Sequence, residues 1–140
     1  MKVAGIIRQD SAVGLYRIGQ PIQQINRRYK EESAITPFTG QGRIYRVVEG
    51  ETSAPAWSDK TLMSICKDAD IMWSNMFANQ DEILRMLNLR KWSGAKWVVD
   101  MDDDIYSIPV DNANKSKVEG AIRNIELCLS LADGVTVSVP

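Results

Sequence analysis

Four carboxylates stand within five positions of one stretch of this chain, at Asp100, Asp102, Asp103 and Asp104. Residues 95–99, directly before them, have the apolar character of a short buried strand, so the carboxylates come where that strand leaves its sheet. Like charges at this density repel one another, and each loses hydration where it is covered. The stretch therefore indicates either a ligand site at the mouth of an α/β sheet or a solvated acidic turn that caps a helix.

An acidic cluster of this kind supports three chemistries. Its oxygens can hold a hard divalent cation such as Mg²⁺. One carboxylate can act as a general base if its neighbours raise its pKa. The carboxylates can also accept hydrogen bonds from the hydroxyl groups of a ligand. The chain contains no histidine, which excludes His-based triads and the commonest general base.

A second candidate site follows the first apolar stretch, residues 3–8. A polar loop leads there to Gly14, directly before a helical pattern, and a helix N-terminus offers free N–H groups to an anion. Arg8 and Arg17 flank the loop, where each can either clamp an anionic ligand or neutralise the Asp cluster. The loop lacks the glycine spacing of dinucleotide-binding and P-loop motifs, which argues against both.

The hydrophobic periodicity predicts five strands and four helices in strict alternation. The expected strands are residues 3–8, 43–48, 71–74, 95–99 and 135–139. The expected helices run from Leu15 past Pro21, from Ser58, from Asn79 to Gly94, and from a Ser116/Glu119 capping box to Ala132. This alternation predicts an α/β domain with a parallel sheet and right-handed crossovers.

We expect residues 1–140 to form a single Rossmann-like three-layer domain with about five strands in the order 3-2-1-4-5. In that order the loop after the first strand and the acidic stretch line one crevice. A flavodoxin-like order is the alternative, and it would place the acidic stretch to one side.

Composition narrows the class of protein. The net charge of −1 gives no general attraction to nucleic acid or to an anionic membrane surface. No apolar run approaches the roughly 20 residues that span a bilayer, and the apolar N-terminal part is too short for a signal peptide. Cys66 and Cys128 fall in expected helices, where we interpret them as small buried hydrophobes of a reduced cytoplasmic protein.

The last expected strand alternates between apolar and polar residues, and no helix follows it. We therefore expect exposed apolar surface near Val137 and Val139, which would favour self-association of the chain.

Several segments resemble GT-B fold glycosyltransferases, including bacterial and phage-encoded members. Residues 3–17, VAGIIRQDSAVGLYR, followed by GQPIQQI, resemble the first strand, glycine loop and first helix of these enzymes. ADIMWSN resembles their third strand, and KWVVDMDDDIYSIP their strand and acidic loop. LADGVTVSVP resembles the segment that closes their N-terminal domain. Together these segments cover nearly the whole chain.

The resemblance implies the N-terminal, acceptor-binding half of an enzyme that transfers a sugar from a nucleotide-sugar donor. It implies Asp102 as the catalytic base or hydroxyl acceptor, with Gly14, Arg17, Asp103 and Arg8 as substrate-binding residues. It implies no metal and no other cofactor. Donor contacts would come from a second domain that this chain does not resemble, so we expect the chain alone to be inactive.

Two other interpretations stay open. The first is a non-catalytic α/β binding or adaptor module that keeps the fold without turnover. The second is a GT-A-like transferase in which Asp100-x-Asp102 would chelate a metal. A receiver-type signalling domain is less favoured, because the third strand ends in Ser74-Asn75 and not in an aspartate.

Overall fold

The computed structural model describes residues 1–7, 14–32, 41–46, 60–102 and 104–137. The strands are β1 (Lys2–Ile7), β2 (Gln41–Arg46), β3 (Ile71–Asn75), β4 (Lys96–Met101) and β5 (Gly134–Val137). The helices are α2 (Gln20–Glu32), α3 (Lys60–Cys66), α4 (Gln80–Ser93) and α5 (Lys115–Leu131), with a π-helical turn (Leu15–Gly19) before α2. This alternation, together with parallel pairing throughout the sheet, confirms the predicted α/β class.

The strand order is β2-β1-β3-β4-β5, so the predicted order 3-2-1-4-5 is wrong. The observed order is the flavodoxin-like alternative, in which β1 pairs with both β2 and β3. As a consequence, β3 lies between β1 and the strand that carries the acidic stretch.

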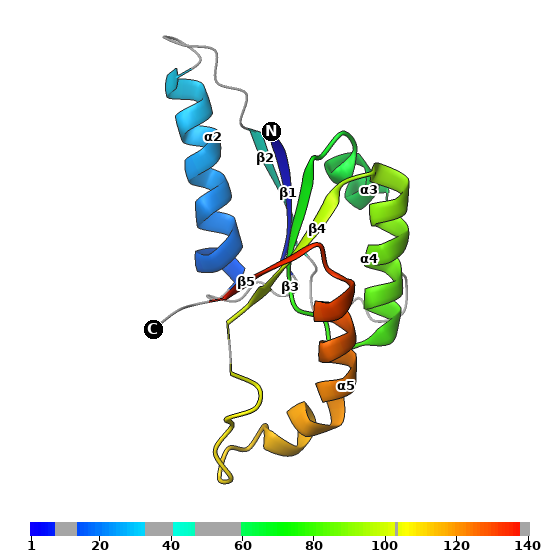
Figure 1. Cartoon of the computed structure of the whole chain (residues 1–140). Helices are drawn as coiled ribbons and strands as arrows, with labels where there is room; N and C mark the ends of the chain where they lie inside the picture. Colours follow the sequence, from blue (N-terminus) through cyan, green and yellow to red (C-terminus); the bar gives the residue numbers. More distant parts are fainter. Residues whose placement is uncertain (8–13, 33–40, 47–59, 103, 138–140) are drawn as a thin grey trace.

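The physical reason for this order is the face of the sheet on which each helix packs. Figure 1 shows α2 on one face, and α3, α4 and α5 on the opposite face. A right-handed crossover whose helix packs on one face of the sheet advances the chain in one direction along the sheet. A right-handed crossover whose helix packs on the opposite face advances it in the other direction. Because α3 lies on the face opposite α2, the chain returns past β1 and places β3 on the far side of it.

Two apolar clusters fill the two sides of the sheet. The larger joins the sheet to α3, α4 and α5 and includes the fully buried Met72, Phe77 and Trp97. The smaller joins β1 to α2 and the π-helical turn through Ile7, Ile18 and other buried side chains. Strand β1 is therefore covered on both faces, which explains its continuous apolar run.

The ends of α4 agree with their sequence signals. The Asn79 side chain accepts a hydrogen bond from the Asp81 amide at 2.8 Å, and Gly94 ends the helix with a φ of 74°. Only glycine adopts that left-handed conformation without steric cost. The predicted capping box of α5 is wrong, because Ser116 lies inside the helix and Asn114 occupies the cap position.

Pro21 is the second residue of α2, directly after the π-helical turn. A proline ring in a helix clashes with the carbonyl group four residues earlier and supplies no N–H. A widened turn over Leu15–Gly19 accommodates the ring without ending the helix.

The edge strand β5 ends at Val137, so Val139 of the expected strand lies outside the described residues. Val137 is 57% exposed, as the alternating pattern predicted. Cys66 and Cys128 are free thiols and both are buried. Among the described residues, no helix is both long and apolar enough to cross a membrane.

Candidate functional site

Asp100, the first carboxylate of the acidic stretch, is buried in a two-point ion pair. Only 2% of the residue is exposed. Arg17 donates from Nε to Asp100 Oδ2 at 2.5 Å and from Nη2 to Oδ1 at 2.8 Å. Thr136 Oγ1 donates to the same Oδ1 at 2.6 Å. Both carboxylate oxygens are therefore engaged, and Arg17 neutralises the Asp cluster at this position.

Arg17 follows β1 in the chain and Asp100 lies on β4, and β3 separates these two strands in the sheet. Arg17 belongs to the π-helical turn, which packs on β1 and β3, and its long side chain extends to the end of β4. Trp73 Nε1 donates to Thr136 Oγ1 at 3.4 Å and so joins β3 to the network. A buried charge of this kind persists only when it is paired. The network thus holds the start of the acidic stretch against the segment that leads into α2.

The carboxylates that follow have different surroundings. Asp102 is half-buried, and Asp103 lies outside the described residues. Asp104 is exposed, and its Oδ1 accepts hydrogen bonds from the amides of Tyr106 at 3.0 Å and Ser107 at 3.3 Å. A hydrogen bond from the Ser107 side chain, then the one from the Tyr106 amide, lowers the pKa of Asp104 below its usual value. Asp104 therefore stabilises a turn of the loop.

The two remaining predicted residues, Gly14 and Arg8, follow β1 in the sequence. Gly14 is buried directly before the π-helical turn, and Arg8 lies outside the described residues. Among the described residues, no group of three or more Cys, Asp or Glu side chains is placed to hold a metal ion. Because Asp100 is already paired with Arg17, the interpretation of Asp100-x-Asp102 as a metal chelate has no geometric support.

A pocket of about 530 Å³ lies between the loop after β4 and the first half of α5, and we call it the loop pocket. Its apolar lining includes Ile105, Ile108, Pro109, Val118 and Ile125. Its polar lining consists of Asp104, Ser107, Asn112, Asn114 and Lys117. The size is typical of small-molecule sites, and the mixture of apolar walls with a few polar groups is typical as well.

Specific contacts hold the loop that forms this pocket. Ile105 is buried, and Tyr106 donates from its hydroxyl to Glu126 Oε1 on α5 at 3.0 Å. That hydrogen bond raises the pKa of Tyr106 above its usual value. Asn112 Oδ1 accepts from the Asn114 amide at 2.8 Å, whereas the Asn114 side chain makes no capping hydrogen bond with α5. The Asn114 carboxamide is therefore available at the pocket.

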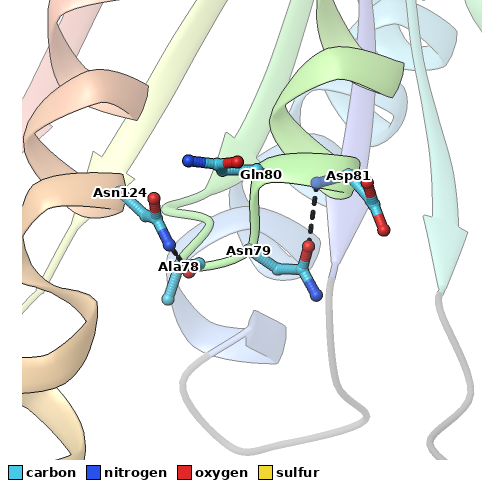
Figure 2. Close-up of a pocket in the computed structure, with 5 residues that line it drawn as sticks. All are labelled: Ala78, Asn79, Gln80, Asp81 and Asn124. Carbon is cyan, nitrogen blue, oxygen red and sulfur yellow. Dashed lines mark hydrogen bonds between the residues drawn. The ribbon is translucent and has the colours of Figure 1, made fainter.

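A second, open pocket of about 380 Å³ lies between the start of α4 and the middle of α5. We call it the amide pocket, because three of its five lining residues carry carboxamides: Asn79, Gln80 and Asn124. Asn124 Nδ2 donates to the Ala78 carbonyl at 3.0 Å (Figure 2). Ala78 lines both pockets, so the two meet at the segment between β3 and α4.

The predicted site and the pockets share only the acidic stretch. The sequence predicts Asp102 and Asp103 as site residues, whereas the loop pocket is lined by Asp104 and by residues that follow it. The signal that could have indicated this pocket is the placing of Ser107, Asn112 and Asn114 among apolar residues, directly before a helix. Local patterns did not show that this segment folds back along α5.

Comparison with known proteins gives no family for this chain. No protein-family model matches the sequence, and no curated protein matches it either.

Proposed function

We propose that the chain is the acceptor-binding domain of a glycosyltransferase that uses a nucleotide-sugar donor, and that the acceptor sugar occupies the loop pocket. The observation that carries this proposal is the lining of that pocket. Carboxamide, hydroxyl and charged groups line it together with apolar side chains, beyond the carboxyl ends of β3 and β4. In parallel α/β sheets, ligands bind at this end.

The lining suits a sugar in two respects. A sugar hydroxyl donates one hydrogen bond and accepts others, and the carboxamide of Asn114 and the hydroxyl of Ser107 can meet both needs. The apolar side chains of Ile108 and Val118 offer a surface for the C–H faces of a sugar ring. With one acidic and one basic side chain in the lining, Asp104 and Lys117, the pocket does not favour a strongly charged ligand.

In the proposed reaction, an acceptor hydroxyl oxygen attacks the anomeric carbon of the donor sugar. The bond from that carbon to the nucleotide phosphate breaks, and the phosphate oxygen leaves with the electron pair. Asp102, two positions before the loop pocket begins, is the proposed base that takes the hydroxyl proton. Arg17 is paired with Asp100, so we assign it a positioning role at the end of β4.

Sugar binding is tested by NMR titration of the ¹⁵N-labelled chain with methyl glycosides of glucose, galactose, mannose and N-acetylglucosamine. We expect shifts at Ser107, Asn114 and Lys117 for at least one of these sugars. Asn114→Ala should weaken that binding by about two- to tenfold, the worth of one net hydrogen bond. It should leave thermal stability nearly unchanged, because the Asn114 side chain makes no capping hydrogen bond.

Asn88→Ala, an exposed change on α4 outside both pockets, is the matched control and should bind like the parent chain. Absence of binding by every sugar would contradict the proposal.

The alternative, a binding module without turnover, shares the pocket and differs in the response to nucleotide-sugars. Binding of one nucleotide-sugar from a panel, in the presence of the bound acceptor, would support the transferase. Absence of donor binding is expected of both, because the donor contacts of the transferase would come from a second domain.

A further inference from the structure

The amide pocket extends the proposed acceptor site. It adjoins the loop pocket at Ala78, and both open beyond the carboxyl ends of the strands. It is an open surface depression of about 380 Å³, and Asn79, Gln80 and Asp81 in its lining are exposed. A ligand longer than the loop pocket can therefore continue across Ala78 into the amide pocket.

The polar groups of the amide pocket are only partly used by the protein. Asn124 donates one hydrogen bond, from Nδ2 to the Ala78 carbonyl, and no described residue donates to its Oδ1. The Gln80 carboxamide has no hydrogen-bond partner among the residues that the structure describes. Figure 2 shows Gln80 extending from α4 toward α5, on the side from which Asn124 projects. Two carboxamides, those of Gln80 and Asn124, thus line one pocket with donors and acceptors that no described residue uses.

The chemistry of this pocket favours a neutral, hydroxyl-rich ligand over an anion. The Asp81 amide at the start of α4 already donates to Asn79 Oδ1, so this amide is not available to an anion. The Asp81 carboxylate lines the same pocket and repels negative charge. Carboxamides supply both donors and acceptors, which is what sugar hydroxyls require.

We propose that the loop pocket and the amide pocket hold successive units of one oligosaccharide acceptor, with the second sugar unit bound between Gln80 and Asn124. This inference rests on the proposed function, because it takes the loop pocket as the site of the first sugar. It specifies the acceptor as a glycan of at least two units.

The test compares the affinity of the chain for each methyl glycoside of the panel with that for disaccharides built from the same unit, by isothermal titration calorimetry. We expect the preferred disaccharide to bind at least about fivefold more tightly, as one or two added hydrogen bonds would give. Gln80→Ala should remove this gain and leave monosaccharide affinity unchanged. Gln80 is the better probe, because replacing Asn124 also removes the bond to Ala78.

The outcomes separate this inference from the proposed function. Equal affinity for monosaccharide and disaccharide overturns the second subsite and leaves the proposed function standing. A disaccharide gain that survives Gln80→Ala overturns the assignment of that subsite to the amide pocket. Failure of every sugar to bind overturns both, and Asn88→Ala again serves as the control with parent-like affinities.

Discussion

Arg17 and Asp100 lie 83 positions apart in the chain, yet the guanidinium group of one meets the carboxylate of the other at two points. The pair sits on the α2 face of the sheet, where Thr136 completes the coordination of the carboxylate. It joins the first helical turn of the chain to the last two strands. The acidic stretch therefore begins with a buried residue that organises the fold, whereas Asp104 at its end is exposed.

Arg17→Met should destabilise the chain by about 3–5 kcal/mol, because it leaves the Asp100 charge buried without its partner. Chemical denaturation measures the free energy of unfolding. Adding Asp100→Asn to Arg17→Met should restore part of the loss, and a double-mutant cycle would give the coupling energy of the pair. Arg123→Met, an exposed change on α5, is the control and should have an effect within about 0.5 kcal/mol. If Arg17→Met lowered the free energy of unfolding by no more than the control does, the structural role of the pair would be contradicted.

Trp97 is fully buried and donates from Nε1 to the buried Ser74 hydroxyl at 2.9 Å. Trp97→Phe should cost about 2 kcal/mol, because it leaves a small cavity and a hydroxyl without its donor. Adding Ser74→Ala should recover about half of that loss, since the unsatisfied group is then removed. The matched control is Trp92→Phe, because Trp92 is 48% exposed on α4. Equal losses for the two Trp→Phe variants would refute this account of the core.

Asp133 lies between α5 and β5, and its carboxylate contacts the start of β4 and the end of α4. Its Oδ2 accepts from the Trp97 amide at 2.9 Å, and its Oδ1 accepts from Arg90 Nη2 at 2.8 Å. The hydrogen bond from the Trp97 amide is the main cause of the lowered pKa of Asp133, and the nearby Arg90 and Lys96 charges add to it. Because the folded state binds the proton more weakly, the stabilisation is present above the unfolded pKa of about 3.9. It is lost as the pH falls through the lower folded-state pKa.

Asp133→Asn should therefore lower the free energy of unfolding by about 1 kcal/mol at pH 7, since one acceptor remains but the charge is lost. The difference between parent and variant should shrink as the pH falls below about 4. Urea unfolding at a series of pH values measures it. A difference that is constant from pH 7 to pH 3 would show that charge at Asp133 has no part in stability.

Burial raises the pKa of the Cys128 thiol to about 11, so the reactive thiolate is scarce at neutral pH. We expect Cys128 to be unreactive toward a disulfide reagent in the folded chain at pH 7.5 and fully reactive in denaturant. A Cys66→Ala variant allows Cys128 to be followed alone. Rapid labelling of that variant under native conditions would contradict the packing around α5.

We propose that the β5 edge mediates weak self-association, because Val135 and Val137 are 43% and 57% exposed on an edge strand. Unpaired edges with apolar side chains are templates for pairing with another chain. Val137→Lys should shift the sedimentation of the chain toward the monomer at high concentration. Val110→Lys, a change at an 86% exposed position in the loop after β4, is the control. A parent chain that is monomeric at all concentrations would refute the proposal.

Local patterns in the sequence determined the elements of this protein. The alternation of strands and helices, the cap at Asn79, the left-handed stop at Gly94 and the exposure of Val137 all depend on residues within a few positions of one another. Propensity, capping and hydrophobic periodicity act over that range, so one sequence was enough to predict them.

Tertiary structure decided the strand order, the pairing of Asp100 and the location of the pockets. The order depends on which face of the sheet α3 covers, and nothing in α3 alone specifies a face. Asp100 meets Arg17 across 83 positions and Thr136 across 36, so its burial became visible only once β3, β4 and β5 were aligned. The loop pocket likewise exists only because the loop after β4 folds back on α5. These features depend on contacts between segments that are distant in the sequence. The free energies of such contacts cannot be predicted from a local pattern.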